Sequence, residues 1–143
     1  MSGRVLVVDD DKVIRQLIKV NLEMEGFEVV TAADGVECLE AVHDVRPDLV
    51  TLDVAMPRLD GLRTAERLRS DPRTRHIPVA IVSGHTPLHG DDGEAPPVDA
   101  FLSKPFDPSE LVRMVRQLTG HPNGETGSGD ADEQESAGWP ARR

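Results

Sequence analysis

Short unbroken apolar runs alternate along residues 1–120 with stretches in which apolar residues recur every three or four positions. The β-branched and aliphatic run at residues 5–8 is typical of a strand that is buried on both faces. A helix is predicted directly after it, with Asp11 as its N-cap and Gly26 at its end. The apolar positions of this helix are Val13, Ile14, Leu17, Ile18 and Leu22.

The same alternation continues to residue 120. Further strands are predicted at residues 27–31, 48–53, 78–83 and 99–103. Two helices between them are predicted at residues 35–43 and along the apolar stripe of Leu62, Ala65 and Leu68. A last helix begins after Asp107, which Glu110 follows as a capping-box partner, and ends at Gly120. Its predicted buried stripe is Leu111, Val115 and Leu118.

Strands that alternate with helices indicate an α/β fold, with a parallel sheet covered by helices on both faces. Right-handed crossovers leave few arrangements of five strands, and the flavodoxin-like, doubly wound order 2-1-3-4-5 is the commonest at this size. We predict this fold for residues 1–120, as one domain. Sheets of this kind bind their ligands at the carboxyl ends of the strands, which is where candidate chemistry should be sought.

Residues 121–143 differ from the rest in composition. They hold four Gly, two Pro and five acidic residues, and Trp139 is their only large apolar side chain. Such a segment buries too little apolar surface to offset the entropy lost on ordering. We therefore predict that it is a disordered, acidic, Gly-rich tail.

Charge and cysteine content narrow the possible functions. The chain of 143 residues has a formal net charge of −10, which argues against direct binding of nucleic acid or of an anionic membrane. Cys38 is the single cysteine, so an internal disulfide and a cysteine-based zinc site are excluded. No apolar run approaches the roughly 18 residues of a membrane span, and the start of the chain does not resemble a signal peptide. A cytoplasmic protein is expected.

Polar side chains follow the predicted strands at their carboxyl ends. Asp9 and Asp10 follow the first strand and Asp53 ends the third, while Ser83 and Lys104 stand at the ends of the fourth and fifth. Crowded carboxylates require a compensating cation, and hard oxygen ligands at a half-open site favour Mg²⁺. A metal ion, a lysine and a hydroxyl around one carboxylate would cradle a phosphoryl group, with Asp53 as the nucleophile.

Each of these residues also has a simpler interpretation when taken alone. Asp9 and Asp10 suit the N-terminus of a helix, Ser83 suits a turn, and Lys104 suits a solvated surface. The functional interpretation depends on all the strand ends pointing to one place.

Four stretches resemble the receiver domain of bacterial two-component response regulators. They read RVLVVDDDKVIRQLI, PDLVTLDVAMPRLDG, IPVAIVSG and FLSKPF, and the resemblance extends over residues 4–119. It implies that a sensor histidine kinase or a phosphotransfer protein donates a phosphoryl group to Asp53. Because no output domain follows residue 120, it also implies a stand-alone receiver that signals through an unknown protein target, as a monomer or weak dimer, and is not itself an enzyme.

The resemblance assigns roles to the strand-end residues. Asp10 would bind Mg²⁺ directly and Asp9 largely through water, and the backbone carbonyl of Ala55 would be a ligand beside Asp53. Ser83 and Lys104 would contact the phosphoryl group.

Two further expectations concern the switch of such receivers. The Lys104–Pro105 peptide bond is expected to be cis. Phe101 matches an aromatic switch position at which many receivers have tyrosine, so here the ring could act only by burial. Ala55 and His85 would tune the lifetime of the phosphorylated state.

One segment departs from the family pattern. Receivers have a fourth helix after the position of Ser83, but residues 84–100 contain three Gly and three Pro and almost no apolar stripe. An irregular or missing fourth helix is therefore predicted over residues 84–98.

Two alternatives remain. One is a receiver-like binding module that phosphorylation does not switch. The other is a phosphatase of the haloacid dehalogenase type, with Asp9 as nucleophile and Ser83 and Lys104 in its later motifs. The final acidic motif of that family should follow the lysine, whereas the acidic pair Asp91–Asp92 precedes Lys104.

Overall fold

The computed structural model describes residues 3–84 and 98–120. The strands are β1 (Arg4–Val8), β2 (Glu28–Ala32), β3 (Leu49–Leu52), β4 (Val79–Ser83) and β5 (Ala100–Ser103). The helices are α1 (Lys12–Met24), α2 (Gly35–Val45), α3 (Gly61–Ser70) and α4 (Pro108–Thr119). Every element predicted within these residues is present.

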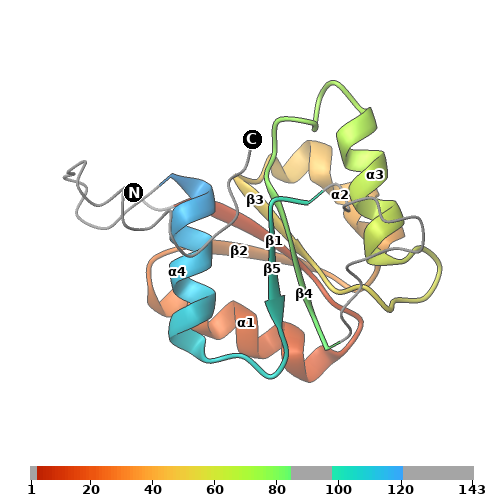
Figure 1. Cartoon of the computed structure of the whole chain (residues 1–143). Coiled ribbons are helices and arrows are strands. Elements are labelled where there is room, and N and C mark those ends of the chain that lie inside the picture. The colour runs from red at the N-terminus through yellow and green to blue at the C-terminus, as the bar shows by residue number, and fades with distance from the viewer. Residues whose placement is uncertain (1–2, 85–97, 121–143) are drawn as a thin grey trace.

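The strands form one parallel sheet in the order β2-β1-β3-β4-β5. Helices α1 and α4 cover one face of this sheet and α2 and α3 cover the other (Figure 1). The predicted flavodoxin-like fold is thus confirmed. The irregular fourth helix was predicted over residues 84–98, of which residues 85–97 lie outside the described residues. The expected tail, residues 121–143, also lies outside them.

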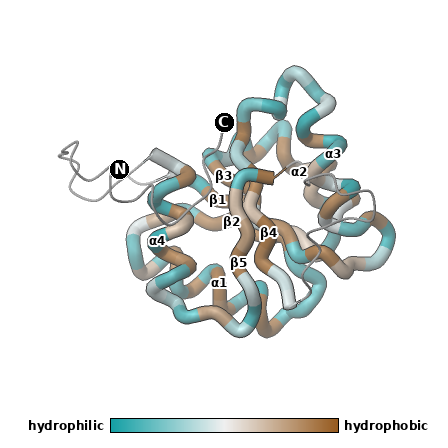
Figure 2. Tube along the Cα trace, viewed as in Figure 1, coloured by the Kyte–Doolittle hydropathy of each residue, from teal (hydrophilic) through white to brown (hydrophobic). Residues whose placement is uncertain are grey.

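The core is divided into two apolar clusters by the sheet. In β1, Val5 and Val7 face the cluster beneath α1 and α4, whereas Leu6 and Val8 face the cluster beneath α2 and α3. The same alternation brings apolar side chains to both faces of β3 and β4, whose residues are all buried. Apolar colour accordingly follows the strands through the centre of the molecule (Figure 2). An unbroken apolar run therefore reflects a central strand that is covered on both sides.

Helix α1 is apolar on two opposite sides. Ile18 and Leu22 are buried against the sheet. Val13 and Leu17, which were predicted among the apolar positions of this helix, are 73 % and 43 % exposed. Two further apolar side chains, Val20 and Met24, are also exposed. Their spacing along the helix places these four residues on one outward stripe, which we call the outer stripe of α1.

An aspartate side chain caps the N-terminus of each described helix. The caps are Asp11, Asp34, Asp60 and Asp107. Because each helix begins shortly after a parallel strand ends, these caps and the helix N-termini lie at the carboxyl edge of the sheet. The predicted capping box of Asp107 and Glu110 is confirmed. Met114, which the sequence prediction omitted, is buried in the same helix.

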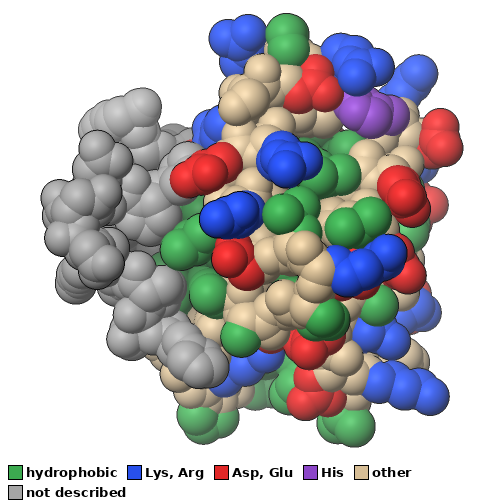
Figure 3. Space-filling view, turned by 90° about the vertical axis from the view of Figure 1, so that its right-hand side faces the viewer, with side chains coloured by type: hydrophobic (Ala, Val, Ile, Leu, Met, Phe, Trp, Pro, Cys, Tyr) green, Lys and Arg blue, Asp and Glu red, His purple; other side chains and the backbone are tan. Residues whose placement is uncertain are grey.

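The acidity of the chain is unevenly distributed. Cationic, anionic and apolar side chains are intermixed on the face shown in Figure 3. Residues 85–97 and 121–143 contribute six of the ten net negative charges. Within residues 3–84 and 98–120, none of the helices has the length and apolar character that crossing a membrane requires.

Candidate functional site

The ends of two neighbouring strands bring the first carboxylates together. Val8 of β1 lies beside Leu52 of β3 in the parallel register. The backbone N–H of Asp53 donates to the carbonyl oxygen of Val8 at 3.0 Å, which carries the pairing one residue further. Asp9 and Asp53 are therefore held side by side at the edge of the sheet by backbone hydrogen bonds.

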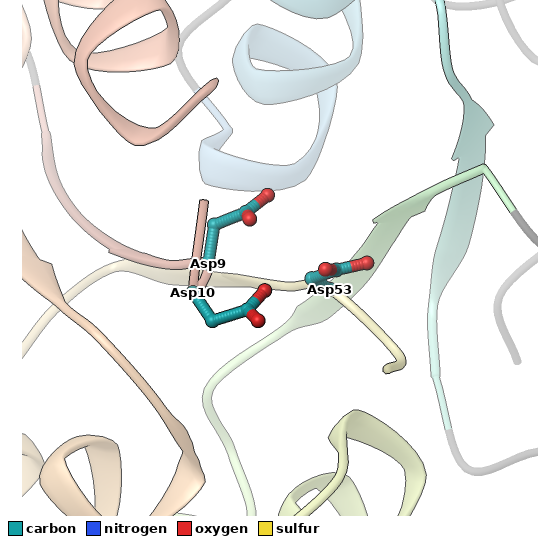
Figure 4. A group of neighbouring side chains, drawn as sticks. All are labelled: Asp9, Asp10 and Asp53. Atoms are coloured by element: carbon teal, nitrogen blue, oxygen red, sulfur yellow. The ribbon is translucent and has the colours of Figure 1, made fainter. Parts of the chain in front are cut away.

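Three carboxylates meet at this edge. One oxygen from each of Asp9, Asp10 and Asp53 lies within 4.8 Å of the others, as Figure 4 illustrates. Asp9 and Asp53 are buried, whereas Asp10 is exposed. The cluster is thus closed on the side of the core and open to solvent beside Asp10.

Lys104 joins the cluster from the end of β5. Its Nζ lies 2.8 Å from Oδ2 of Asp9 and 3.7 Å from Oδ1 of Asp53. The backbone N–H of Lys104 donates to the carbonyl oxygen of Ser83 at 2.9 Å, so the ends of β4 and β5 are tied together. The Lys104–Pro105 peptide bond is cis, as predicted.

Burial dominates the electrostatics of Asp9. It raises the pKa of this carboxyl group above the ordinary value of 3.8, although hydrogen bonds from Lys104 and from the backbone of Asp11 act in the opposite direction. The neighbouring charge of Asp53 raises it further. One lysine therefore does not compensate the buried acidic charge, and a bound cation would stabilise it.

Hydrogen bonds from the surrounding backbone and side chains orient the carboxylates. The N–H of Asp11 donates to Oδ1 of Asp9 at 2.9 Å, and the N–H of Val54 donates to Oδ1 of Asp53 at 2.8 Å. Arg15, on α1, donates through Nη1 to the carbonyl oxygen of Asp9 at 2.8 Å. Sequence reasoning missed Arg15, because nothing in a helical arginine indicates a bond to the preceding strand end.

The remaining predicted site residues differ in how far their side chains are buried. Ser83 is fully buried at the end of β4, and Ala55 is exposed in the connection that follows Asp53. Phe101, in β5, is partly buried against the cluster beneath α2 and α3. No described contact joins Phe101 to the carboxylates, and His85 lies outside the described residues.

The carboxylate cluster fits a magnesium ion. Its donors are hard oxygen atoms from separate side chains, and the open side beside Asp10 leaves room for the water molecules that Mg²⁺ retains. In Figure 4 the carboxylate of Asp10 extends toward the side on which Asp53 lies. Together with Lys104, such a site could neutralise a phosphoryl group placed at Asp53.

Comparisons with known proteins agree with this geometry. Residues 5–116 match the sequence model of the response regulator receiver domain. The DNA-binding dual master transcriptional regulator RpaA of Synechocystis sp. is 39 % identical over 119 residues, which cover 80 % of this chain and 48 % of RpaA. This chain thus spans about half the length of that curated relative.

Solved structures are similar over nearly their whole length. The chemotaxis response regulator CheY4 of Vibrio cholerae has a TM-score of 0.75 and 31 % identity, covering 82 % of this chain and 99 % of CheY4. The receiver domain of the sensor histidine kinase PA1611 of Pseudomonas aeruginosa has a TM-score of 0.73 and 26 % identity, with 84 % and 99 % covered. That structure holds a magnesium ion in its active site cleft. From the match over residues 5–116, this chain belongs to the response regulator receiver domain family of two-component systems.

Proposed function

We propose that this chain accepts a phosphoryl group on Asp53, in a Mg²⁺-dependent reaction, from a phosphohistidine of a sensor histidine kinase or phosphotransfer protein. Membership of the receiver family implies phosphorelay signalling. The observation that carries the specific proposal is the position of Asp53. Its Oδ1 lies 3.7 Å from Nζ of Lys104, and its carboxylate shares the cluster with Asp9 and Asp10.

The transfer balances as a displacement at phosphorus. A carboxylate oxygen of Asp53 forms the new O–P bond as the N–P bond to the histidine breaks, and the released imidazole takes up a proton. Lys104 pairs with the negative charge of the phosphoryl oxygens. When bound, Mg²⁺ supplies further neutralisation of that charge.

The ligands proposed for Mg²⁺ are the carboxylates of Asp10 and Asp53 and the backbone carbonyl of Ala55. Asp9 acts on the ion largely through water, since Oδ2 of Asp9 is already engaged by Lys104 at 2.8 Å. Ser83 would donate its hydroxyl to a phosphoryl oxygen, and Phe101 would respond by a change in burial. This assignment gives Asp53 the role of nucleophile, which the phosphatase alternative gives to Asp9.

The outer stripe of α1 favours a phosphodonor that docks on this chain through a helix. Val13, at the start of the stripe, lies four residues after Asp9, so the apolar surface begins beside the acidic cluster. The stripe then follows the helix through Leu17 and Val20 to Met24, all exposed. An apolar stripe at helical spacing suits packing against a partner helix. A donor that lays a helix here could present its phosphohistidine to Asp53.

The remaining parts of the proposal concern the cell. We place the protein in the cytoplasm, acting on a downstream protein as a monomer or weak dimer. Phosphorylation adds charge at the carboxyl edge of the sheet, and that charge would alter the surface that the downstream partner contacts. The chain is a phosphoacceptor and is not a catalyst that turns over a separate substrate.

Intact-protein mass spectrometry tests the proposal. The chain is incubated with acetyl phosphate, a small phosphodonor, with and without Mg²⁺. We expect one added phosphoryl group that requires Mg²⁺ and is lost in Asp53→Asn. Asp44→Asn, a matched change of an exposed aspartate on α2, should leave the adduct intact.

The absence of a phosphoryl adduct would contradict the proposal. If no adduct forms and a beryllofluoride analogue of the phosphoryl group also fails to bind, the carboxylates are not a phosphoacceptor site. The chain would then be treated as a receiver-like binding module.

A further inference from the structure

The connection between β3 and α3 carries both Asp53 and Ala55, so its conformation decides where two proposed magnesium ligands lie. Arg58, in the middle of this connection, has a φ of 68°. This left-handed backbone conformation is unfavourable for a residue with a side chain, because its Cβ crowds the following carbonyl oxygen. Within the connection, the backbone N–H of Leu59 donates to the carbonyl oxygen of Pro57 at 2.7 Å and closes a tight turn around Arg58. A strained conformation of this kind also needs support from the surrounding structure.

Asp34, the N-cap of α2, provides this restraint. Nε of Arg58 donates to Oδ2 of Asp34 at 2.9 Å, and Nη2 donates to Oδ1 at 3.2 Å. Two parallel hydrogen bonds fix the orientation of the guanidinium group as well as its distance. The pair spans 24 positions of sequence and connects the site loop to a different helix.

Asp34 is itself well fixed. Its side chain is buried, and its Oδ1 accepts a hydrogen bond from the backbone N–H of Glu37 at 2.9 Å. The hydrogen bond from Arg58, followed by that from the backbone of Glu37, holds the pKa of Asp34 below its ordinary value. Asp34 is therefore ionised at neutral pH, and the hydrogen bond from Glu37 anchors it to the first turn of α2.

Close packing holds the connection on the same side. A Cβ at Gly35 would come within 2.6 Å of the carbonyl oxygen of Leu59, so the connection lies directly on the first turn of α2. A Cβ at Gly61 would come within 2.1 Å of the carbonyl oxygen of Asp53. The N–H of Gly61 donates to the carbonyl oxygen of Val54 at 2.9 Å, which closes the loop at its other end.

We infer that Arg58 is a positioning residue for the metal and phosphoryl site. Its ion pair with Asp34 holds the β3–α3 connection, which carries Asp53 and Ala55, in one conformation against the first turn of α2. Arg58 touches none of the carboxylates of the cluster, so it acts through the backbone. This inference rests on the proposed function of the site and adds a determinant of its metal affinity.

The exposure of Arg58 separates this role from a purely structural one. The Arg58 side chain is 55 % exposed, and ion pairs of exposed side chains contribute little to the stability of the fold. Removal of the guanidinium should therefore affect the geometry of the loop more than the unfolding of the domain. Partners that orient metal ligands from outside the ligand set change metal affinity by roughly 10-fold to 100-fold when they are replaced.

The test uses variants of the full chain that separate the ion pair from the backbone conformation. Arg58→Gly removes the ion pair but accepts a left-handed backbone without strain. Arg58→Lys keeps the charge but loses the two-pronged hydrogen bonding. Asp34→Asn weakens the pair from the other side. Arg75→Ala, at an exposed arginine between α3 and β4, is the control.

Mg²⁺ is titrated calorimetrically into each variant, and the thermal midpoint is measured without metal. We expect Arg58→Gly to raise the Mg²⁺ dissociation constant by about 10-fold with little change in the midpoint. Arg58→Lys should recover only part of the affinity, and Arg75→Ala should match the unmodified chain.

An unchanged Mg²⁺ affinity in Arg58→Gly would overturn the inference, as would a lowered thermal midpoint as its only effect. The proposed function fails by a different result, namely the absence of a phosphoryl adduct on the unmodified chain. Magnesium binding that depends on Arg58 without any phosphorylation would retain the inference and reject the phosphoacceptor.

Discussion

The interior of the sheet and its carboxyl edge are built from the same strands, but their side chains contribute differently to the free energy of folding. Leu6 and Leu52 are fully buried among apolar neighbours, where removal from water favours folding. Asp9 and Asp53 follow one to three residues later and bury carboxylates close to one another. Most of the free energy of folding therefore comes from the interior, whereas the buried carboxylates at the edge would be stabilised by a bound cation.

The largest effect on stability is expected from truncation inside the sheet. Leu6 is fully buried in the cluster beneath α2 and α3, so Leu6→Ala should lower the free energy of unfolding by about 2–5 kcal/mol. Urea denaturation of the two proteins measures the difference. A loss below about 1 kcal/mol would contradict the comparison, because the interior would then tolerate a cavity.

A smaller loss is expected from a carboxylate of the edge that caps a helix. The Asp107 side chain accepts from the backbone N–H of Ser109 and forms a capping box with Glu110. Asp107→Ala should cost about 1 kcal/mol in urea denaturation. Asp44→Ala, at an exposed aspartate without a cap, should change stability by less than about 0.5 kcal/mol. Equal losses in both variants would show that the cap has no particular role.

Replacing a buried carboxylate of the cluster should stabilise the fold, in contrast to replacing the helix cap. Because burial raises the pKa of Asp9, its ionised form is less stable in the folded chain than in the unfolded chain. Asp9→Asn should therefore produce a small gain in thermal midpoint at pH 7 without Mg²⁺, below the magnitude of the cap effect, and should weaken Mg²⁺ binding.

The raised pKa of Asp9 also determines how this gain in thermal midpoint depends on pH. As the pH falls through the raised pKa of Asp9, the native carboxyl group takes up a proton earlier than the unfolded one, and the unmodified chain becomes more stable relative to the variant. Thermal scans at several pH values should show the gain of Asp9→Asn shrinking as the solution becomes more acidic. A gain that grows toward low pH would mean that burial is not the dominant effect on Asp9.

The smallest effect on stability is expected on the outer stripe of α1. Leu17 is exposed, so Leu17→Ser should change the free energy of unfolding by less than about 0.5 kcal/mol. Phosphorylation by acetyl phosphate should be unaffected, because that donor needs no docking surface. Transfer from a histidine kinase or phosphotransfer protein should slow, since an apolar contact is lost. If the variant and the unmodified chain accept the phosphoryl group from the histidine kinase or phosphotransfer protein at the same rate, the stripe is not part of the donor interface.

Much of the fold and the centre of the site could be predicted from the sequence. The rule that strand ends of a parallel sheet meet at one edge was enough to bring Asp9, Asp53 and Lys104 together, and their contacts confirm it. This succeeded because unbroken apolar runs located the strands independently of the polar residues that follow them.

Other features depend on tertiary structure that no local pattern specifies. Helix α1 is apolar on opposite sides, so periodicity alone did not distinguish outward Leu17 from inward Ile18. The ion pair of Arg58 with Asp34 joins residues that become neighbours only when the β3–α3 connection lies on α2. Single charged residues in loops carry no indication of such a partner.

The alternation of β1 also limits how the length of this protein can change. Val5 and Val7 face one cluster, Leu6 and Val8 face the other, and Asp9 follows at once. Deleting or inserting one residue within β1 would exchange the faces of all later positions in the strand and move the carboxylate out of the site. Insertions and deletions should therefore be tolerated at exposed positions of the connections at the amino edge, such as residues 72–73, and rejected within the strands. A library of single-residue deletions, scored for folded protein, would map that boundary residue by residue.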